Sequence, residues 1–117
     1  MTQPETPTVS DPVECQVDAY NRHDLEAFVD WYAPDTQIED ASGGVLMRGR
    51  DAMRAAYREL FRESPSLRVA IVTRIRISDY VIDEEIVTGR RGSSEEVRVV
   101  VVYHVAEGLI DHLRMIR

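Results

Sequence analysis

Two adjacent carboxylates, Glu39 and Asp40, end a short extended segment that follows the aromatic pair Trp31-Tyr32. Side chains of neighbouring residues in an extended segment point to opposite faces. One carboxylate is therefore expected to face the interior and the other solvent. Because a carboxylate in an apolar interior can serve as a general base, the inward-facing one decides whether this segment contributes to an active site.

His104 and Asp111 form a second candidate pair near the C-terminal end. His104 interrupts an apolar strand, and Glu107-Gly108 is a two-residue hairpin signal that would set Asp111 across from it. A carboxylate beside an imidazole orients the ring and raises its basicity. The alternative is a histidine at the surface or at a dimer interface. His112, on the opposite face from Asp111, is expected to be exposed.

Glu84 is the third candidate, because it lies between Ile82 and Ile86 in an alternating segment. A carboxyl group on an apolar face would have a raised pKa and could donate a proton. The alternative is that Glu84 reaches the sheet edge or pairs with an arginine of a neighbouring strand. The other face of the same segment carries Val81, Asp83, Glu85 and Val87.

Composition limits the function classes. The chain has 117 residues and a formal net charge of -7, which disfavours binding to nucleic acid or to an anionic membrane. Residues 1–10 are expected to be a mobile tail and residues 11–117 a single domain. Cys15 is the only cysteine, which excludes an internal disulfide and favours a cytoplasmic location. No residue spacing indicates a metal site, and no metal or other cofactor is expected.

Capping residues and periodicity predict the elements that position these candidates. Asp11 and Asp24 are N-cap residues for two helices, the second of which reaches Tyr32 before a turn at Pro34-Asp35. Hydrophobic spacing then predicts a short strand at 45–48, a third helix at 51–63 and long strands at 67–78, 81–88, 95–106 and 109–117. Three helices followed by a curved antiparallel sheet make an α+β fold.

Val99 to Val102 is apolar on both faces, as in a strand that is covered on both sides. Helices can cover one side and a second copy of the chain the other, so a homodimer through the outer sheet face is expected. Five arginines form a basic strip that is interpreted as a solvated or interface face, partly offset by nearby acids. They are Arg68, Arg74, Arg76, Arg90 and Arg91.

The sequence resembles the nuclear transport factor 2-like superfamily, and within it the SnoaL-like and ketosteroid-isomerase-like branch. The resemblance spans roughly residues 12–117 and is carried by four segments: Tyr20 to Leu25, Phe28 to Asp40, Arg48 to Arg54, and Tyr103 to Ile110. It implies a cone-shaped, cystatin-like fold with an apolar cavity open at one end, and dimers through the outer sheet face. The activity stays open, because this fold serves isomerases, cyclases, hydrolases, dehydratases and non-enzymes.

The resemblance assigns a role to Asp40. In the ketosteroid isomerases a carboxylate after the second helix abstracts a proton next to a carbonyl, and Asp40 falls on that position. Glu39 would then point outward and be solvated. The alternative for Asp40 is a strand-end carboxylate that bonds the turn at Ser42 or Gly43.

The resemblance is incomplete where the enolate oxygen is held. The isomerases use a tyrosine and a protonated aspartate for this purpose. Here the tyrosine position holds Gln16, and the aspartate position falls on Val100 or Val101. Since loss of such donors lowers rates by orders of magnitude, authentic steroid isomerase activity is not expected.

Two functions are therefore carried forward. The first is an enzyme that binds a small apolar molecule, with Asp40 as general base for an isomerase- or cyclase-type proton transfer and His104 or Glu84 assisting. The second is a ligand-binding or dimerisation module without catalysis. In this architecture core residues are also cavity walls, and the expected substrate contacts are Gln16, Trp31, Tyr32, Tyr57, Val100, Val102 and Leu113.

Overall fold

The computed structural model describes residues 11–117, so the expected tail at 1–10 lies outside the described residues. Helix α1 (Pro12–Asn21) begins where predicted, because the Asp11 carboxylate accepts hydrogen bonds from the backbone N–H groups of Val13 and Glu14 at 2.9 and 3.4 Å. Helix α2 (Leu25–Val29) is capped by Asp24, which accepts from the backbone N–H of Ala27. Both predicted N-caps are confirmed.

Helix α2 is shorter than predicted, and strand β1 (Tyr32–Glu39) already begins at Tyr32. The expected turn at Pro34-Asp35 is therefore wrong. The pairing of β1 with strand β6 (Leu109–Ile116) is irregular between Tyr32 and Gln37. Proline, which has no backbone N–H to donate, fits such an interrupted stretch of a strand.

The six strands form one mixed sheet in the order β2-β1-β6-β5-β4-β3. The pair β1–β6 is parallel and the other pairs are antiparallel. The prediction of an antiparallel sheet is corrected at that pair, while the α+β class stands. The remaining elements are β2 (Val45–Arg48), α3 (Gly49–Glu63), β3 (Arg68–Ile77), β4 (Tyr80–Thr88), the 3-10 turn η1 (Arg90–Gly92) and β5 (Val97–Ala106).

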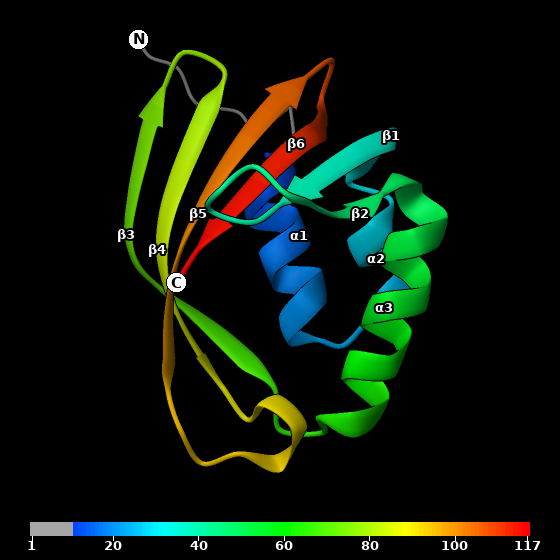
Figure 1. Ribbon diagram of the computed structural model, residues 1–117, viewed down its shortest axis with the longest axis vertical. Coiled ribbons are helices and arrows are strands. Elements are labelled where there is room, and N and C mark those ends of the chain that lie inside the picture. The colour runs from blue at the N-terminus through cyan, green and yellow to red at the C-terminus, as the bar shows by residue number, and fades with distance from the viewer. Residues whose placement is uncertain (1–10) are drawn as a thin grey trace, which may run out of the picture.

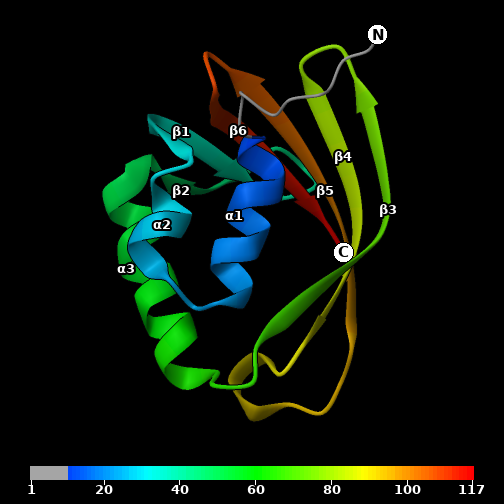
Figure 2. The same cartoon turned by 180° about the vertical axis from the view of Figure 1, so that it is seen from behind.

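The sheet is bent, and all three helices lie inside the bend (Figures 1 and 2). Apolar side chains of the concave face and of the helices form one core. Its best-buried members include Val13, Phe28, Val29, Tyr32, Ile38, Met53, Val101, Tyr103 and Ile110. Burial of this apolar surface drives the helices onto the sheet.

The convex face of the sheet carries exposed apolar side chains beside several polar pairs. Ile75 and Ile77 of β3 are 53% and 63% exposed, and Tyr80 and Ile116 are also exposed. No helix within residues 11–117 is long and apolar enough to cross a membrane. The cytoplasmic location stays a prediction.

Candidate active site

A cavity of about 320 Å³ lies between the helices and the concave face of the sheet. Every helix and strand contributes to its wall, and most of the lining is apolar or aromatic. The apolar part consists of Val17, Phe28, Leu46, Met47, Ala56, Leu60, Val69, Val87, Val99, Val101, Leu113 and Met115. This volume lies at the lower end of the roughly 300–1,000 Å³ usual for small-molecule sites.

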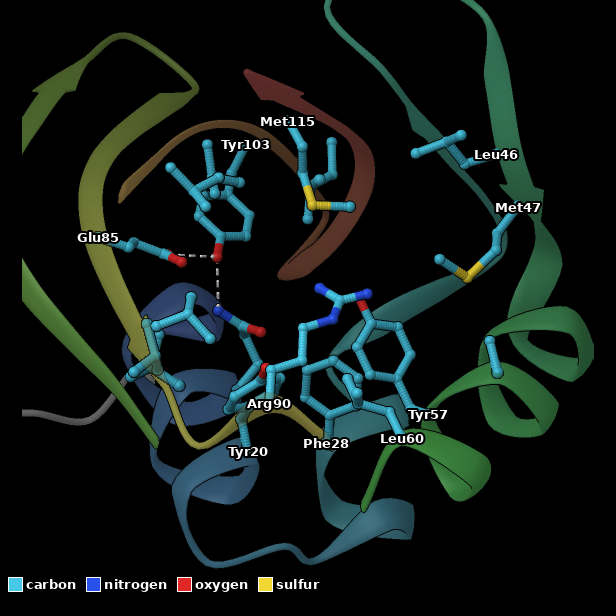
Figure 3. A pocket seen from close by; sticks show the side chains of 18 of the residues that line it. Tyr20, Phe28, Leu46, Met47, Tyr57, Leu60, Glu85, Arg90, Tyr103 and Met115 are labelled. Carbon is cyan, nitrogen blue, oxygen red and sulfur yellow. Dashed lines mark hydrogen bonds between the residues drawn. The ribbon is translucent and has the colours of Figure 1, made fainter. Parts of the chain in front are cut away.

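One end of the cavity holds a continuous chain of buried hydrogen bonds. The Tyr32 hydroxyl donates to Gln16 Oε1 at 2.9 Å, and Gln16 Nε2 donates to the Tyr103 hydroxyl oxygen at 3.0 Å. The Tyr103 hydroxyl in turn donates to Glu85 Oε2 at 3.2 Å. Figure 3 shows the last two of these bonds converging on Tyr103 beside Glu85. Because Gln16 Nε2 also donates to the Val13 carbonyl at 3.1 Å, its amide is fully used within the protein.

Glu85 is a carboxyl group held away from water. It is 7% exposed and lines the cavity. Burial raises the pKa of Glu85 to about 7, and the negative charge of Asp83 adds to the rise, whereas the Tyr103 hydrogen bond and the charge of Arg74 oppose it. A carboxyl group with a pKa near the working pH can both take up and release a proton.

Asp83 explains how two acids coexist on the inner face of β4. Asp83 is fully buried, and Arg74 binds it through two bonds, Nε to Oδ1 at 2.7 Å and Nη2 to Oδ2 at 2.9 Å. This two-pronged geometry is the strong form of a carboxylate–guanidinium pair. The charge of Asp83 is therefore neutralised by Arg74, whereas the carboxyl group of Glu85 faces the cavity.

The cavity wall also carries Arg90, Tyr20 and Tyr57. Burial raises the pKa of Tyr57 to about 12 and raises that of Tyr20 as well, and the positive charge of Arg90 partly offsets both rises. In Figure 3 the Arg90 side chain reaches across the cavity toward the Tyr57 ring.

The structure places Asp40 outside the wall of this cavity. Its Oδ1 accepts from the Ser42 backbone N–H, the Ser42 hydroxyl and the Gly44 backbone N–H at 3.0, 2.7 and 2.9 Å. The Ser42 bond, followed by the Gly44 bond, lowers the pKa of Asp40. Asp40 borders an adjoining hollow, which shares Leu46, Met115 and Arg117 with the cavity wall. Its expected inward position is corrected, because the chain has left β1 and entered the turn that Asp40 closes.

Glu39 is not solvated as expected but paired on the convex face. Its carboxylate binds Arg114 Nη2 at 2.9 Å and His112 Nε2 at 3.1 Å, and accepts from Gln37 Nε2 at 2.6 Å. These bonds, with Arg114 first, lower the pKa of Glu39 to about 2. The expected exposure of His112 is corrected to a half-buried side chain. Neither member of the carboxylate pair lines the main cavity.

His104 has the partner that was predicted, but in another register. Its Nδ1 lies 2.6 Å from Asp111 Oδ1. The hairpin signal is right at Ala106 and Leu109, whereas an irregularity in β6 sets His104 opposite His112 rather than Asp111. The ring also contacts Tyr80 edge-on. His104 does not line the cavity, because it occupies an outward-facing position of β5.

For Glu84 the alternative interpretation is the correct one, because it pairs with an arginine of a neighbouring strand. Its carboxylate pairs with Arg98, which lies diagonally from it on β5, opposite Ile86, on the convex face. Asp83 and Glu85 occupy the inward-facing positions of β4. The apolar neighbours of Glu84 had suggested that Glu84 would face inward. None of the three proposed catalytic side chains thus lines the main cavity.

Among the expected substrate contacts, Gln16, Tyr32, Tyr57 and Leu113 line the cavity. Trp31, Val100 and Val102 do not, the two valines because Val99 and Val101 take the inward positions of β5.

Sequence reasoning missed Glu85, Tyr103 and Arg90. For Glu85 one signal was present, since Asp83 and Glu85 share the face of Val81 and Val87. Two acids flanked by valines on one strand face indicate a buried polar site as readily as a solvated face. For Arg90, which lies in a loop, periodicity offers no signal.

Comparisons with known proteins agree on the fold. The SnoaL-like domain family matches residues 13–113. Among curated proteins no match to the chain was found. A cystatin-fold protein from Novosphingobium aromaticivorans has a similar structure, with 24% identity, a TM-score of 0.83, and coverage of 91% of this chain and 95% of that one.

Two further solved structures extend the comparison. A proposed polyketide cyclase from Sinorhizobium meliloti is 21% identical with a TM-score of 0.77, and covers 92% and 94% of the two chains. A protein with a ketosteroid isomerase-like fold from Catenulispora acidiphila, in complex with trimethylamine, is 20% identical with a TM-score of 0.72, and covers 92% and 85%. These likenesses establish the NTF2-like, cystatin-like fold.

Proposed function

This chain belongs to the SnoaL-like domain family, and on that premise we propose that it is a small-molecule enzyme whose interior cavity carries out proton transfer with Glu85 as the acid–base group. The reaction class is isomerase- or cyclase-type chemistry on an apolar, carbonyl-bearing molecule. The structural likeness to a proposed polyketide cyclase is in keeping with this class.

The observation that carries the proposal is the position of Glu85. Its side chain is the one acidic side chain in the cavity wall among the residues that the structure describes. Its pKa of about 7 keeps protonated and ionised forms populated near neutral pH. A proton-transfer catalyst needs this balance between the two forms.

The chemistry follows from the two protonation states. Ionised Glu85 takes a proton from the carbon next to a carbonyl, and the electron pair of that C–H bond moves into the carbonyl to give an enolate. For isomerisation, Glu85 returns the proton to another carbon of the same molecule. For ring closure, the enolate carbon attacks a second carbonyl and Glu85 protonates the resulting alkoxide. Both routes need no oxidant or reductant.

Tyr103, Gln16 and Tyr32 are positioning residues in this proposal. The Tyr103 hydroxyl donates to Glu85 and is itself fixed by Gln16, whose amide oxygen is held by Tyr32. A side chain fixed by such a network loses little freedom when substrate binds.

The test compares two carboxylates and a control. Turnover of a panel of cyclic ketones and epoxides is measured for the wild type and for Glu85→Gln, Asp40→Asn and Glu84→Gln. We expect Glu85→Gln to lose about 10²–10⁴-fold and the other two to stay within about twofold. A loss confined to Asp40→Asn would overturn the role of Glu85 and restore Asp40 as the base.

A non-catalytic ligand-binding function is the second candidate, and the state of Gln16 favours it. The Gln16 amide is used within the protein and donates nothing to the cavity. Ligand binding by every variant, with no turnover of any panel member by the wild type, would establish this function instead.

We also propose a homodimer through the convex face of the sheet. Exposed Ile75, Ile77 and Tyr80 continue onto half-buried Val100 and Val102 on one apolar surface. An apolar sheet face of this kind is typical of an association surface. Light scattering at micromolar concentration should give twice the chain mass, and a particle of 13.4 kDa would contradict the dimer.

A further inference from the structure

Several hydrogen-bond donors of the cavity wall have no partner among residues 11–117. The Arg90 guanidinium and the Tyr20 and Tyr57 hydroxyls line the cavity and make no hydrogen bond or ion pair there, and the same holds for the exposed Arg117 just after β6. None of these groups contains a sealed, unsatisfied atom, so they open onto the cavity. Because buried phenol hydroxyls normally find a partner, these open donors indicate an acceptor that the described part of the chain does not supply.

The loop that carries Arg90 is built to hold it there. Gly89 has φ +78°, and a Cβ at this position would lie 2.2 Å from the Ser66 carbonyl oxygen, so only glycine lets the two backbones approach. On the other side, the Arg91 backbone N–H donates to Ser64 Oγ at 2.8 Å. The contacts of Gly89 and Arg91 thus hold the backbone of Arg90 in place, and the Arg90 side chain takes no part in them.

Two other arginines differ from Arg90 because they are paired. Arg91 Nε binds Glu63 Oε1 at 2.7 Å, and Arg74 is paired with Asp83. Arg117, just after β6, also lines the cavity and makes no ion pair within residues 11–117. An unpaired guanidinium in a mostly apolar wall is therefore a site for an anion brought in from outside, and its planar fork matches a carboxylate best.

We propose that the ligand of this cavity is an apolar ring compound bearing a carboxylate, with the carboxylate held by Arg90, Tyr57 and Tyr20 and the ring directed toward Glu85. The inference rests on the proposed function, since it names the substrate class of the same cavity. The polar groups of the cavity then have different roles. Arg90 and the two tyrosines hold the anion, and Glu85 moves the proton on another part of the molecule.

The test uses a matched pair of probes, 2-naphthoate and its neutral amide 2-naphthamide, which differ in charge but hardly in shape. Their affinities are measured by calorimetry for the wild type and for Arg90→Gln, Arg91→Gln, Tyr57→Phe and Glu85→Gln. Thermal melts confirm that each variant is folded. Arg91→Gln is the matched control, because Arg91 belongs to the same loop and also lines the cavity, but its charge is already paired with Glu63.

We expect the wild type to prefer the acid over the amide by at least about tenfold, in line with a charge-assisted bond. Arg90→Gln should bring this ratio close to one, Arg91→Gln should leave it unchanged, and Tyr57→Phe should reduce it severalfold. Equal affinity for acid and amide in the wild type, an unchanged ratio in Arg90→Gln, or no binding of either probe would overturn the proposal. Retention of the acid preference in Glu85→Gln separates ligand recognition from proton transfer, so either proposal can fail without the other.

Discussion

Glu85 and Asp40 lie on opposite sides of the cavity wall, and the protein surrounds them with opposite environments. Glu85 has one hydrogen-bond donor, Tyr103, and a buried anion, Asp83, nearby. Asp40 has three donors on a single oxygen and borders a surface hollow. The pKa of Glu85 is raised to about 7, and that of Asp40 is lowered.

A carboxylate can therefore occupy the catalytic position of a family pattern without having the protonation behaviour that catalysis needs. A carboxylate whose charge is stabilised by turn N–H groups gains little from taking up a proton, so it is a poor base at neutral pH. A carboxylate deprived of water is the better candidate, even without a motif around it. Four variants test this contrast, and they are given in order of decreasing expected effect.

Arg74→Met should have the largest effect on folding. It leaves the fully buried Asp83 without its partner, and removal of one member of a buried pair typically costs about 3–5 kcal/mol. Urea denaturation measures the free energy of unfolding. The double variant Arg74→Met/Asp83→Leu is the control and should recover much of the loss. A loss below about 1 kcal/mol for the single variant would show that water reaches Asp83.

Glu85→Gln should stabilise the protein at alkaline pH. The folded-state pKa of about 7 exceeds the ordinary value of 4.5, so the folded state binds more protons and wild-type stability falls as pH rises from about 4.5 to about 7. At 1.36 kcal/mol per pH unit this amounts to roughly 3 kcal/mol. Melts of wild type and variant between pH 4 and pH 8 check this. Parallel curves would contradict a raised pKa.

Asp40→Ala should lower the melting temperature by only a few degrees at pH 7, because it removes turn bonds at the surface. Since the pKa of Asp40 is lowered by folding, its contribution is present above the ordinary aspartate pKa of about 3.9 and is lost as pH falls. The melting curves of variant and wild type should therefore converge in acid. Asp40→Asn, which keeps an acceptor, should lie between them.

Glu84→Gln should have the smallest effect. Its partner Arg98 is 61% exposed, and exposed ion pairs contribute about 0–1 kcal/mol. Added salt should reduce even this difference in urea denaturation. An effect as large as that of Glu85→Gln would mean that the two faces of β4 had been assigned the wrong way round.

Most of the fold could be predicted from the sequence, because caps, hydrophobic periods and the hairpin at Glu107-Gly108 act locally. The N-caps at Asp11 and Asp24 and the long strands are examples. The end of helix α2 and the parallel β1–β6 pair depend on contacts between distant residues, and local patterns do not contain them.

The candidate site was predicted only in part, for a physical reason. Alternation in β4 correctly separates Glu84 from Glu85, but hydrophobicity cannot say which face is inward when both faces of the sheet carry apolar side chains. Gln16, Tyr32, Tyr57 and Leu113 were found because cavity walls and core coincide in this fold. The inward direction of Arg90 arises from the close approach of Gly89 to Ser66, which no local pattern encodes.

The parallel pairing of β1 with β6 also governs how the molecule assembles. It joins Tyr32 to Ile110 and Ile38 to Leu113, contacts between parts of the chain that are far apart in sequence. Closing so long a loop slows folding. The edge formed by β1 and β2 can join the rest of the sheet only once β6 is present. The side of the cavity wall that these two strands form therefore depends on a long-range contact.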